Sequence, residues 1–298
     1  MGIPDTDARI GFIGAGRVAA GLGLALSRRG YRVALVFSRN RASAERLAAR
    51  VTGCAAAASA QALVDGCDLV FLTVPDDALE AATAAIAWRP GIAAVHCSGA
   101  ADLGVLAAAE RAGAAVGGFH PLQMFADPEV AVQGLARCAI AVEATEPLAS
   151  RLVELVHALG ARPLRVPAGG RAAYHAGAHY AGAFAAALLR EAVRIWAAIG
   201  IPENDAVPAL LGLLRGSTDA MEHDGLARAM AGSVSRGDSG TVRRHIEALR
   251  SLDPAFADFY ARLALRTVPL ALERGSISPE KAEELNRILN GALGPKTG

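Results

Sequence analysis

Short apolar runs alternate with helical stretches over the first half of the chain. The runs are rich in Val, Ile, Leu and Phe, are bounded by turn residues, and are Ile10–Ile13, Arg32–Phe37, Leu69–Val74, Ala93–Cys97, Ala139–Val142 and Pro163–Val166. Helical periodicity fills the intervals between them, as at Val18–Arg28, Arg41–Val51 and Asp77–Ala87. Apolar strands joined by helical crossovers predict a doubly wound parallel sheet of the α/β class. Such a sheet binds ligands at the carboxyl ends of its strands.

The pattern changes after Pro167, where strand signals stop and helical periodicity continues from Arg171 to Asn290. We therefore predict an α/β domain over residues 1–168 and an all-helical domain over residues 169–298. Glycine and proline residues in the helical half predict that helices end at Gly200–Pro202, Gly216–Ser217, Gly232–Ser233 and Asp253–Pro254.

Composition excludes several classes of protein. The 298 residues carry a net charge of +1, which gives no electrostatic reason to expect nucleic acid or a membrane surface as partner. Residues 172–189 contain no Asp, Glu, Lys or Arg, but they are mostly Ala and Gly, so we expect a buried helix rather than a membrane span. The four cysteines form no CxxC pair, and no secretory signal opens the sequence. We expect a cytoplasmic protein.

A glycine-rich turn directly follows the first predicted strand and opens the first helix. Gly14-Ala15-Gly16-Arg17-Val18-Ala19 has the form G-x-G-x-x-A. The first glycine permits a tight turn, the second lets the backbone approach a pyrophosphate, and the small alanine lets helix and strand pack closely. The helix N-terminus adds free N–H groups and a favourable dipole. This order of elements predicts a Rossmann-type dinucleotide site; the alternative is the same fold without a ligand.

The end of the second strand distinguishes between the two nicotinamide cofactors. An NAD site carries an acidic residue here, about 20 residues past the glycines, which accepts from the ribose hydroxyl. The chain instead has Ser38 and Arg39, followed by Arg41. A hydroxyl and a guanidinium can bind a 2′-phosphate, so we predict NADP(H), although these arginines can also belong to a solvated turn. Val74 and Pro75, at the next strand end, are expected to lie beside the cofactor.

Three segments place further polar groups where the strands end. Asp76 and Asp77 follow Pro75 and are best explained as helix caps. His96-Cys97-Ser98-Gly99-Ala100 follows the fourth apolar run, and the loop Phe119-His120-Pro121-Leu122-Gln123-Met124-Phe125 combines polar and aromatic groups. Loops in this position often carry function, although a histidine can also cap a turn.

Together with the glycine turn and Tyr174-His175, these segments resemble the proteins that join a Rossmann domain to a DUF2520 domain. That family is similar to the 6-phosphogluconate dehydrogenase-like superfamily, with its hydroxyacid dehydrogenases and pyrroline-5-carboxylate reductases. The resemblance extends to Ser235-Arg236-Gly237-Asp238 near the end of the chain. It implies a helical second domain and a homodimer, but no settled substrate.

The chain departs from that superfamily at two positions. Its hydroxyacid dehydrogenases carry a catalytic Lys, followed four residues later by Asn, where this chain has Arg171 and His175. Arginine stays protonated and can hold an anionic substrate but cannot donate a proton, whereas histidine can do acid–base work near neutrality. We therefore predict His175 as general acid and Arg171 as substrate anchor, with Ser98 and His120 beside them. His175 can equally be a packed helix residue.

His175 and His179 share a helix face, but no third ligand follows at a suitable spacing, so we predict no metal. The sequence thus predicts an NADP(H)-dependent oxidoreductase for a small carbonyl, hydroxyl or imine substrate, bound between the two domains. The alternative is a dinucleotide-binding sensor or scaffold without turnover, which the loss of the superfamily Lys and Asn would favour.

Overall fold

The computed structural model describes residues 7–167 and 169–294, and these residues divide into two compact units. The first unit ends at Gly182 and the second begins at Ala183. Helix α8 (Arg171–Ala181) thereby groups with the sheet, whereas the boundary predicted at residues 168 and 169 precedes it.

The first unit is built on an eight-stranded sheet with the order β3-β2-β1-β4-β5-β6-β7-β8. Its strands are β1 (Ile10–Ile13), β2 (Val33–Phe37), β3 (Ala55–Ala56), β4 (Leu69–Leu72), β5 (Ala93–His96), β6 (Ala115–Pro121), β7 (Ala139–Ala144) and β8 (Arg162–Arg165). All neighbours pair in parallel except β6 and β7, which are antiparallel. This mostly parallel, Rossmann-type sheet confirms the predicted fold class.

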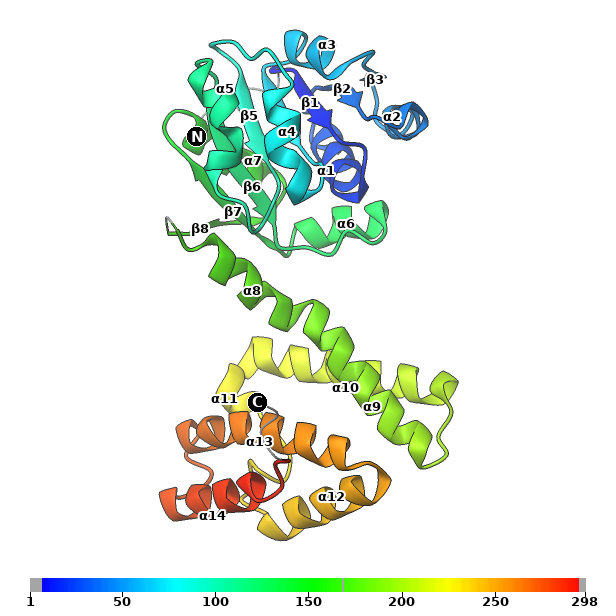
Figure 1. The fold of residues 1–298 in the computed structure, drawn as a ribbon, viewed down its shortest axis with the longest axis vertical. Coiled ribbons are helices and arrows are strands. Elements are labelled where there is room, and N and C mark those ends of the chain that lie inside the picture. The colour runs from blue at the N-terminus through cyan, green and yellow to red at the C-terminus, as the bar shows by residue number, and fades with distance from the viewer. Residues whose placement is uncertain (1–6, 168, 295–298) are drawn as a thin grey trace. The chain divides into compact units, whose positions relative to one another are not determined.

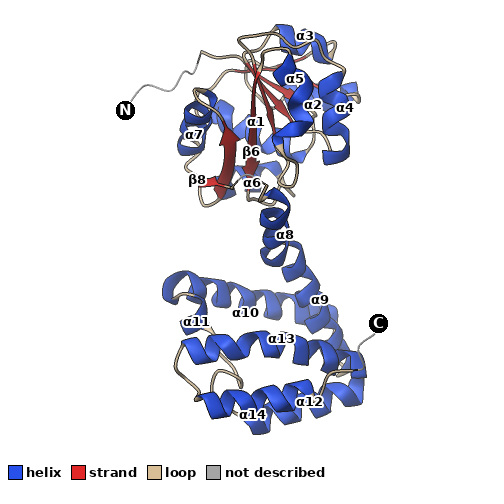
Figure 2. Ribbon diagram, turned by 60° about the vertical axis from the view of Figure 1, so that its left-hand side comes forward, coloured by secondary structure: helices blue, strands red, loops and turns tan. Residues whose placement is uncertain are grey.

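Helices cover both faces of the sheet (Figures 1 and 2). They are α1 (Arg17–Arg28), α2 (Arg41–Ala48), α3 (Ala60–Asp65), α4 (Leu79–Ala84), α5 (Ala107–Arg111), α6 (Pro128–Leu135) and α7 (Leu148–Ala158), with short 3-10 helices at Asp76–Ala78 and Leu103–Leu106. Apolar side chains of α1, α2, α6 and α7 form one core with the sheet, and those of α3, α4 and α5 form a second. Burial on both faces explains why β1 and β4 carry no polar side chain.

Two strands differ from the sequence prediction. β3 is two residues long, too short to leave a signal. β6 extends through Phe119-His120-Pro121, which the sequence suggested as a loop, because Gly117 and Gly118 mask its β-propensity. A Cβ at residue 117 would lie 3.1 Å from Leu152 Cδ1 and 3.2 Å from the Glu143 carbonyl oxygen, a tight fit that favours glycine there.

The second unit is helical, as predicted. Its helices are α9 (Ala183–Ala198), α10 (Glu203–Asp224), α11 (Leu226–Ala229), α12 (Ser239–Leu252), α13 (Pro254–Glu273) and α14 (Pro279–Asn290). The last three pack through a core that includes Val242, Val268 and Leu285. Asp238 is the N-cap of α12, and its carboxylate accepts from the Thr241 N–H at 2.9 Å.

Three breaks fall where expected, but the one at Gly216–Ser217 does not exist. α10 continues through it, and the Ser217 hydroxyl donates to the Leu213 carbonyl inside the helix. Residues 222–224 form the last turn of α10.

The uncharged stretch 172–189 is not one buried helix. It divides at Gly182 into α8 and α9, and in α8 only Arg171 is buried. Within the described ranges, every helix falls short of the length and apolarity that a membrane span needs.

Candidate functional site

The turn between β1 and α1 requires its first glycine. Gly14 has φ +108°, a conformation that side chains rarely adopt, and a Cβ there would lie 2.7 Å from the carbonyl carbon of Thr73. The Thr73 hydroxyl donates to the carbonyl oxygens of Ile13 and Gly14, at 3.2 and 3.1 Å, and so ties the turn to the end of β4.

The second glycine leaves space for a ligand instead. Gly16 is the N-cap of α1, has no side chain to cap the helix, and a Cβ there would meet nothing within 4 Å. The N–H groups of the first turn therefore face open space with the positive end of the helix dipole behind them. This cradle fits a pyrophosphate.

A cavity of about 580 Å³ opens beside this turn. Seven of the nine residues predicted to bind the cofactor line it, namely Gly14, Ala15, Gly16, Ser38, Arg39, Val74 and Pro75. Arg17 and Val18 do not line it; they begin α1, and Val18 packs partly against the core.

Two features of this cavity were not anticipated from the sequence. Ser43 joins Ser38 and Arg39 in its lining. One wall is apolar and suits a flat ring; it consists of Ala78, Ala81, Ala82 and Ala85. No acidic side chain is among the described residues that line it. A phosphate on the ribose therefore meets hydroxyls and a guanidinium without a carboxylate to repel it.

A second polar cluster lies after β4, β5 and β6, where the sequence predicted the reacting groups. The Ser98 hydroxyl donates to the Asp76 carboxylate at 2.7 Å and accepts from the N–H groups of Ala100 and Ala101. Asp76 thus bonds to Ser98 and does not cap a helix, which corrects the capping interpretation. Ser98 is buried and its hydrogen bonds are in use, so it orders the turn after β5 rather than offering a hydroxyl to a substrate.

His120 lies near the end of β6 and is half-buried. Its Nδ1 lies 2.8 Å from the Tyr174 hydroxyl of α8. Burial, followed by the neighbouring His175 and Arg171 as smaller causes, lowers the pKa of His120 to about 4. His120 is therefore neutral at ordinary pH. Tyr174 belongs to a motif noted in the sequence, but its contact with His120 was not predicted.

His175 lies close to His120 over the backbone of Gly99. The two imidazole rings meet edge to face with centroids 5.8 Å apart. A Cβ at residue 99 would lie 2.5 Å from His175 Cδ2 and 2.8 Å from His120 Nε2, so only glycine lets both rings approach this turn. His179 stacks edge to face on His175 at 4.6 Å. In the described residues no three His, Cys, Asp or Glu side chains gather as a metal site.

Arg171 lies at the start of α8 with only 1% of its surface exposed. Its Nε donates to the Glu143 carboxylate of β7, and its Nη1 donates to the Ser98 carbonyl oxygen at 3.0 Å. A guanidinium that is buried and paired in this way holds α8 against the sheet. Its Nη2 has no hydrogen-bond partner among the described residues. This environment indicates a positioning role for Arg171, and its contact with a substrate anion stays a prediction.

His96, the last residue of β5, is fully buried. Neither of its ring nitrogens has a hydrogen-bond partner among the residues that the structure describes. Burial and, as a smaller cause, the nearby positive charge of Arg171 together lower the pKa of His96 to about 4. His96 is therefore a neutral packing residue behind the site.

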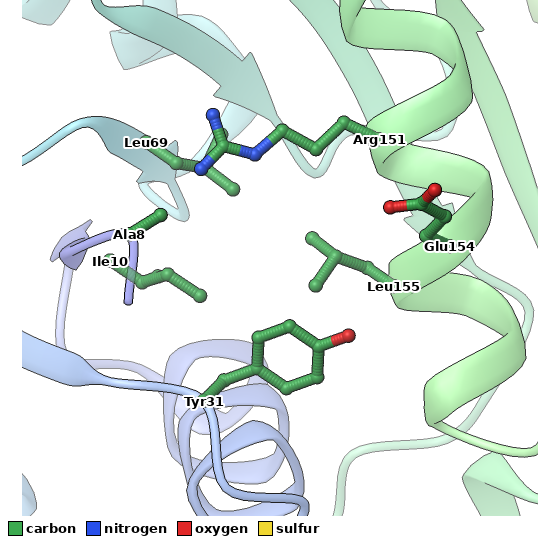
Figure 3. Close-up of a pocket in the computed structure, with 7 residues that line it drawn as sticks. All are labelled: Ala8, Ile10, Tyr31, Leu69, Arg151, Glu154 and Leu155. Atoms are coloured by element: carbon green, nitrogen blue, oxygen red, sulfur yellow. The ribbon is translucent and has the colours of Figure 1, made fainter. Parts of the chain in front are cut away.

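A small cavity of about 10 Å³ lies between β1, β4 and α7, at the opposite ends of the strands (Figure 3). Tyr31, Arg151 and Glu154 line it together with apolar side chains. The space holds about one water molecule, so it is no substrate site.

Comparison with known proteins finds family models that match two parts of the chain. Residues 138–267 match the family model for the domain of unknown function DUF2520. Before this segment, residues 9–93 match the family described as NADP oxidoreductase, coenzyme F420-dependent, which supports the NADP(H) prediction. Among curated proteins, no match to the chain was found.

Solved structures show the same fold as this chain. A Thermotoga maritima protein is 21% identical with a TM-score of 0.71, covering 89% of this chain and 99% of its own. A reductive aminase from Aspergillus terreus, in complex with NADPH4, cyclohexanone and allyl amine, is 18% identical with a TM-score of 0.61 and coverage of 96% and 93%. A Plasmodium falciparum pyrroline carboxylate reductase with NADP bound is 11% identical, with a TM-score of 0.59 and coverage of 96% and 99%.

Proposed function

We propose that the protein is an NADP(H)-dependent oxidoreductase that acts on a small carbonyl, hydroxyl or imine substrate. The turn at Gly14–Gly16 would hold the pyrophosphate, and Ser38, Arg39 and Ser43 would hold the 2′-phosphate. Bound there, the cofactor supplies or accepts a hydride at its nicotinamide ring. The chain's own residues orient the substrate and donate or accept the proton that accompanies the hydride.

The observation that carries this proposal is the convergence of His120 and His175 over Gly99. This pair is connected to the cofactor cavity by a short series of contacts. Pro75 lines the cavity, its neighbour Asp76 bonds to Ser98, and Ser98 precedes Gly99. A protein that only binds a dinucleotide has no need for two imidazoles at this edge of the sheet.

His175 is the proposed general acid. An imidazolium can donate a proton near neutral pH to the oxygen or nitrogen that gains charge when a hydride is added. His120 is neutral because of its burial, so it can orient the substrate but does not supply this proton. Since Arg171 is paired with Glu143, an anionic group on the substrate would require another partner.

A sensor or scaffold that binds NADP(H) without turnover is the second candidate. The burial of Arg171, at the position of the superfamily lysine, favours it, because the usual proton donor is replaced by a residue that packs.

Turnover separates the two candidates. Purified protein is given NADPH and a panel of keto acids, aldehydes, ketones and cyclic imines, and NADPH oxidation is followed. We expect turnover that falls at least about 100-fold in His175→Ala, the usual worth of a general acid, with unchanged NADPH binding. His223→Ala, which removes an exposed histidine of the helical unit, is the matched control and should keep full activity. Tight NADPH binding without turnover of any substrate would favour the sensor.

The proposal includes a homodimer in the cytoplasm. Leu213 and Leu226 of the helical unit are 69% and 66% exposed, which favours a covering partner. The cysteines are free thiols, as in a reducing compartment. Light scattering during gel filtration should give twice the mass of one chain, and one chain mass would refute the dimer. Fractionation of cells that express the tagged chain tests the location.

A further inference from the structure

The contact between His120 and Tyr174 joins the sheet to α8 at the centre of the candidate site. His120 Nδ1 and the Tyr174 hydroxyl oxygen are 2.8 Å apart, and the rings meet edge to face at 87° with centroids 5.7 Å apart. At this distance one group donates a hydrogen bond and the other accepts it. The identity of the donor determines whether the ring proton of neutral His120 resides on Nδ1 or on Nε2.

Chemistry favours the tyrosine as donor. A phenol is a good donor and a weak acceptor, whereas an unprotonated imidazole nitrogen is a strong acceptor. Burial raises the pKa of Tyr174 to about 12, so its proton stays in place. His120 is neutral and carries one ring proton. If Nδ1 accepts from Tyr174, that proton must reside on Nε2.

The Nε2 side of the ring faces the turn after β5. A Cβ at residue 99 would lie 2.8 Å from Nε2, so glycine leaves open the space that this N–H would use. His175 lies at the same glycine, at 2.5 Å from that Cβ position. In the part of the chain that the structure describes, Nε2 makes no hydrogen bond.

From these contacts we infer that Tyr174 fixes His120 as the Nε2–H tautomer, which makes His120 a neutral hydrogen-bond donor beside His175. The part that concerns substrate rests on the proposed function. His120 would donate from Nε2 to the lone pair of a carbonyl oxygen or imine nitrogen, while His175 supplies the proton. The site would therefore select substrates with an acceptor atom at the reacting carbon. Tyr174 is a positioning residue, because it acts through His120.

Nitrogen NMR tests the tautomer without substrate or cofactor. Protein labelled with ¹⁵N in histidine is examined at pH 7 through long-range correlations between ring protons and nitrogens, and His120→Gln identifies the His120 signals. We expect a protonated Nε2 and an unprotonated, hydrogen-bonded Nδ1. A protonated Nδ1 would overturn the inference. The wild-type spectrum suffices for this result, even if a variant fails to fold.

Tyr174→Phe tests the role of the hydroxyl. Loss of its hydrogen bond should shift the Nδ1 resonance downfield, and an unmoved Nδ1 would overturn the assignment to Tyr174. The matched control is Tyr260→Phe, because Tyr260 makes the same contact with His245 in the helical unit, at 3.0 Å and with rings at 87°. This control should leave the His120 resonances unmoved.

Activity provides the second measurement once a substrate is found. Tyr174→Phe should lower kcat/KM by roughly 3- to 10-fold, about the worth of one hydrogen bond, with unchanged NADPH affinity. An unchanged kcat/KM would overturn the substrate part of the inference. A protonated Nε2 together with no turnover on any substrate would contradict the proposed function and leave the tautomer assignment standing, so the two failures are distinguishable.

Discussion

His96 makes the first unit sensitive to mildly acidic pH. An unfolded histidine takes up a proton as the pH falls through about 6.5, whereas folded His96, with its pKa lowered to about 4, stays neutral until much lower pH. Between these values the unfolded state binds more protons, so the free energy of unfolding decreases as the pH falls. For one such residue, linkage gives a loss of about 2 kcal/mol from pH 7 to pH 5.

The substitution His96→Leu removes this titration with little change in volume. Both ring nitrogens lack partners among the described residues, so an apolar side chain leaves no broken hydrogen bond behind. We expect the variant to lose about 2 kcal/mol less than the wild type between pH 7 and pH 5. His120 has a similarly lowered pKa, but it titrates equally in both proteins.

Urea unfolding followed by tryptophan fluorescence measures the difference. The chain has two tryptophans, Trp88 in the first unit and Trp196 in the second, so a Trp196→Phe background makes the signal report on the first unit. His223→Leu, at an exposed position, should retain the wild-type loss. The reasoning is refuted if His96→Leu shows the wild-type pH dependence. If the variant does not fold, NMR titration of wild-type His96 decides, because protonation near pH 6.5 would contradict the account.

Further predictions concern the cofactor cavity and the turn after β5. Gly16→Val should keep the wild-type Tm but abolish NADPH binding in calorimetry, because its side chain enters open space; retained binding would contradict the cradle. Gly14→Ala should instead lower the Tm, since its φ of +108° and the contact with Thr73 leave no room. Arg39→Ala should reduce the preference for NADPH over NADH by roughly 10- to 100-fold in Kd, the worth of a charge-assisted hydrogen bond, and an unchanged ratio would show that Arg39 is a surface residue. Ser98→Ala should destabilise the protein by about 1–3 kcal/mol in urea unfolding, because it strips partners from two N–H groups and from Asp76; a loss below about 0.5 kcal/mol would contradict this.

The sequence predicted the cofactor half of the site more fully than the reacting half. The turn Gly14–Gly16 combines a local motif with a strand before it and a helix after it, so neighbouring residues carry nearly all of the information. Ser43 was missed because it lies in the first turn of α2, beyond the end of β2 where the motif places the ribose contact.

The reacting cluster depends on contacts between distant segments. The order of the strands was enough to bring Ser98 and His120 to one edge of the sheet. The pairing of Arg171 with Glu143 was not predictable, because it requires β7 to run antiparallel to β6, and β6 was itself hidden by two glycines. For the same reason the hydroxyl of Tyr174 had no predicted partner, and the contacts of Ser98 with Asp76 and of Arg171 with Glu143 were not predicted.

Helix breaks were predicted correctly where glycine and proline act together. Gly200–Pro202 ends α9, and Asp253–Pro254 starts α13 with an aspartate cap. Gly216–Ser217 failed as a break because a single glycine weakens a helix without ending it, and Ser217 satisfies its hydroxyl within the helix.

Isotope transfer from the cofactor tests the central claim most directly. The protein is incubated with the substrate panel and NADPH that carries deuterium at the transferable position of nicotinamide C4, and the products are analysed by mass spectrometry. The account predicts one product that gains one deuterium in the presence of the wild type, and far less of it with His175→Ala. Products without deuterium from either labelled face of the ring would contradict the assignment of this site to hydride transfer.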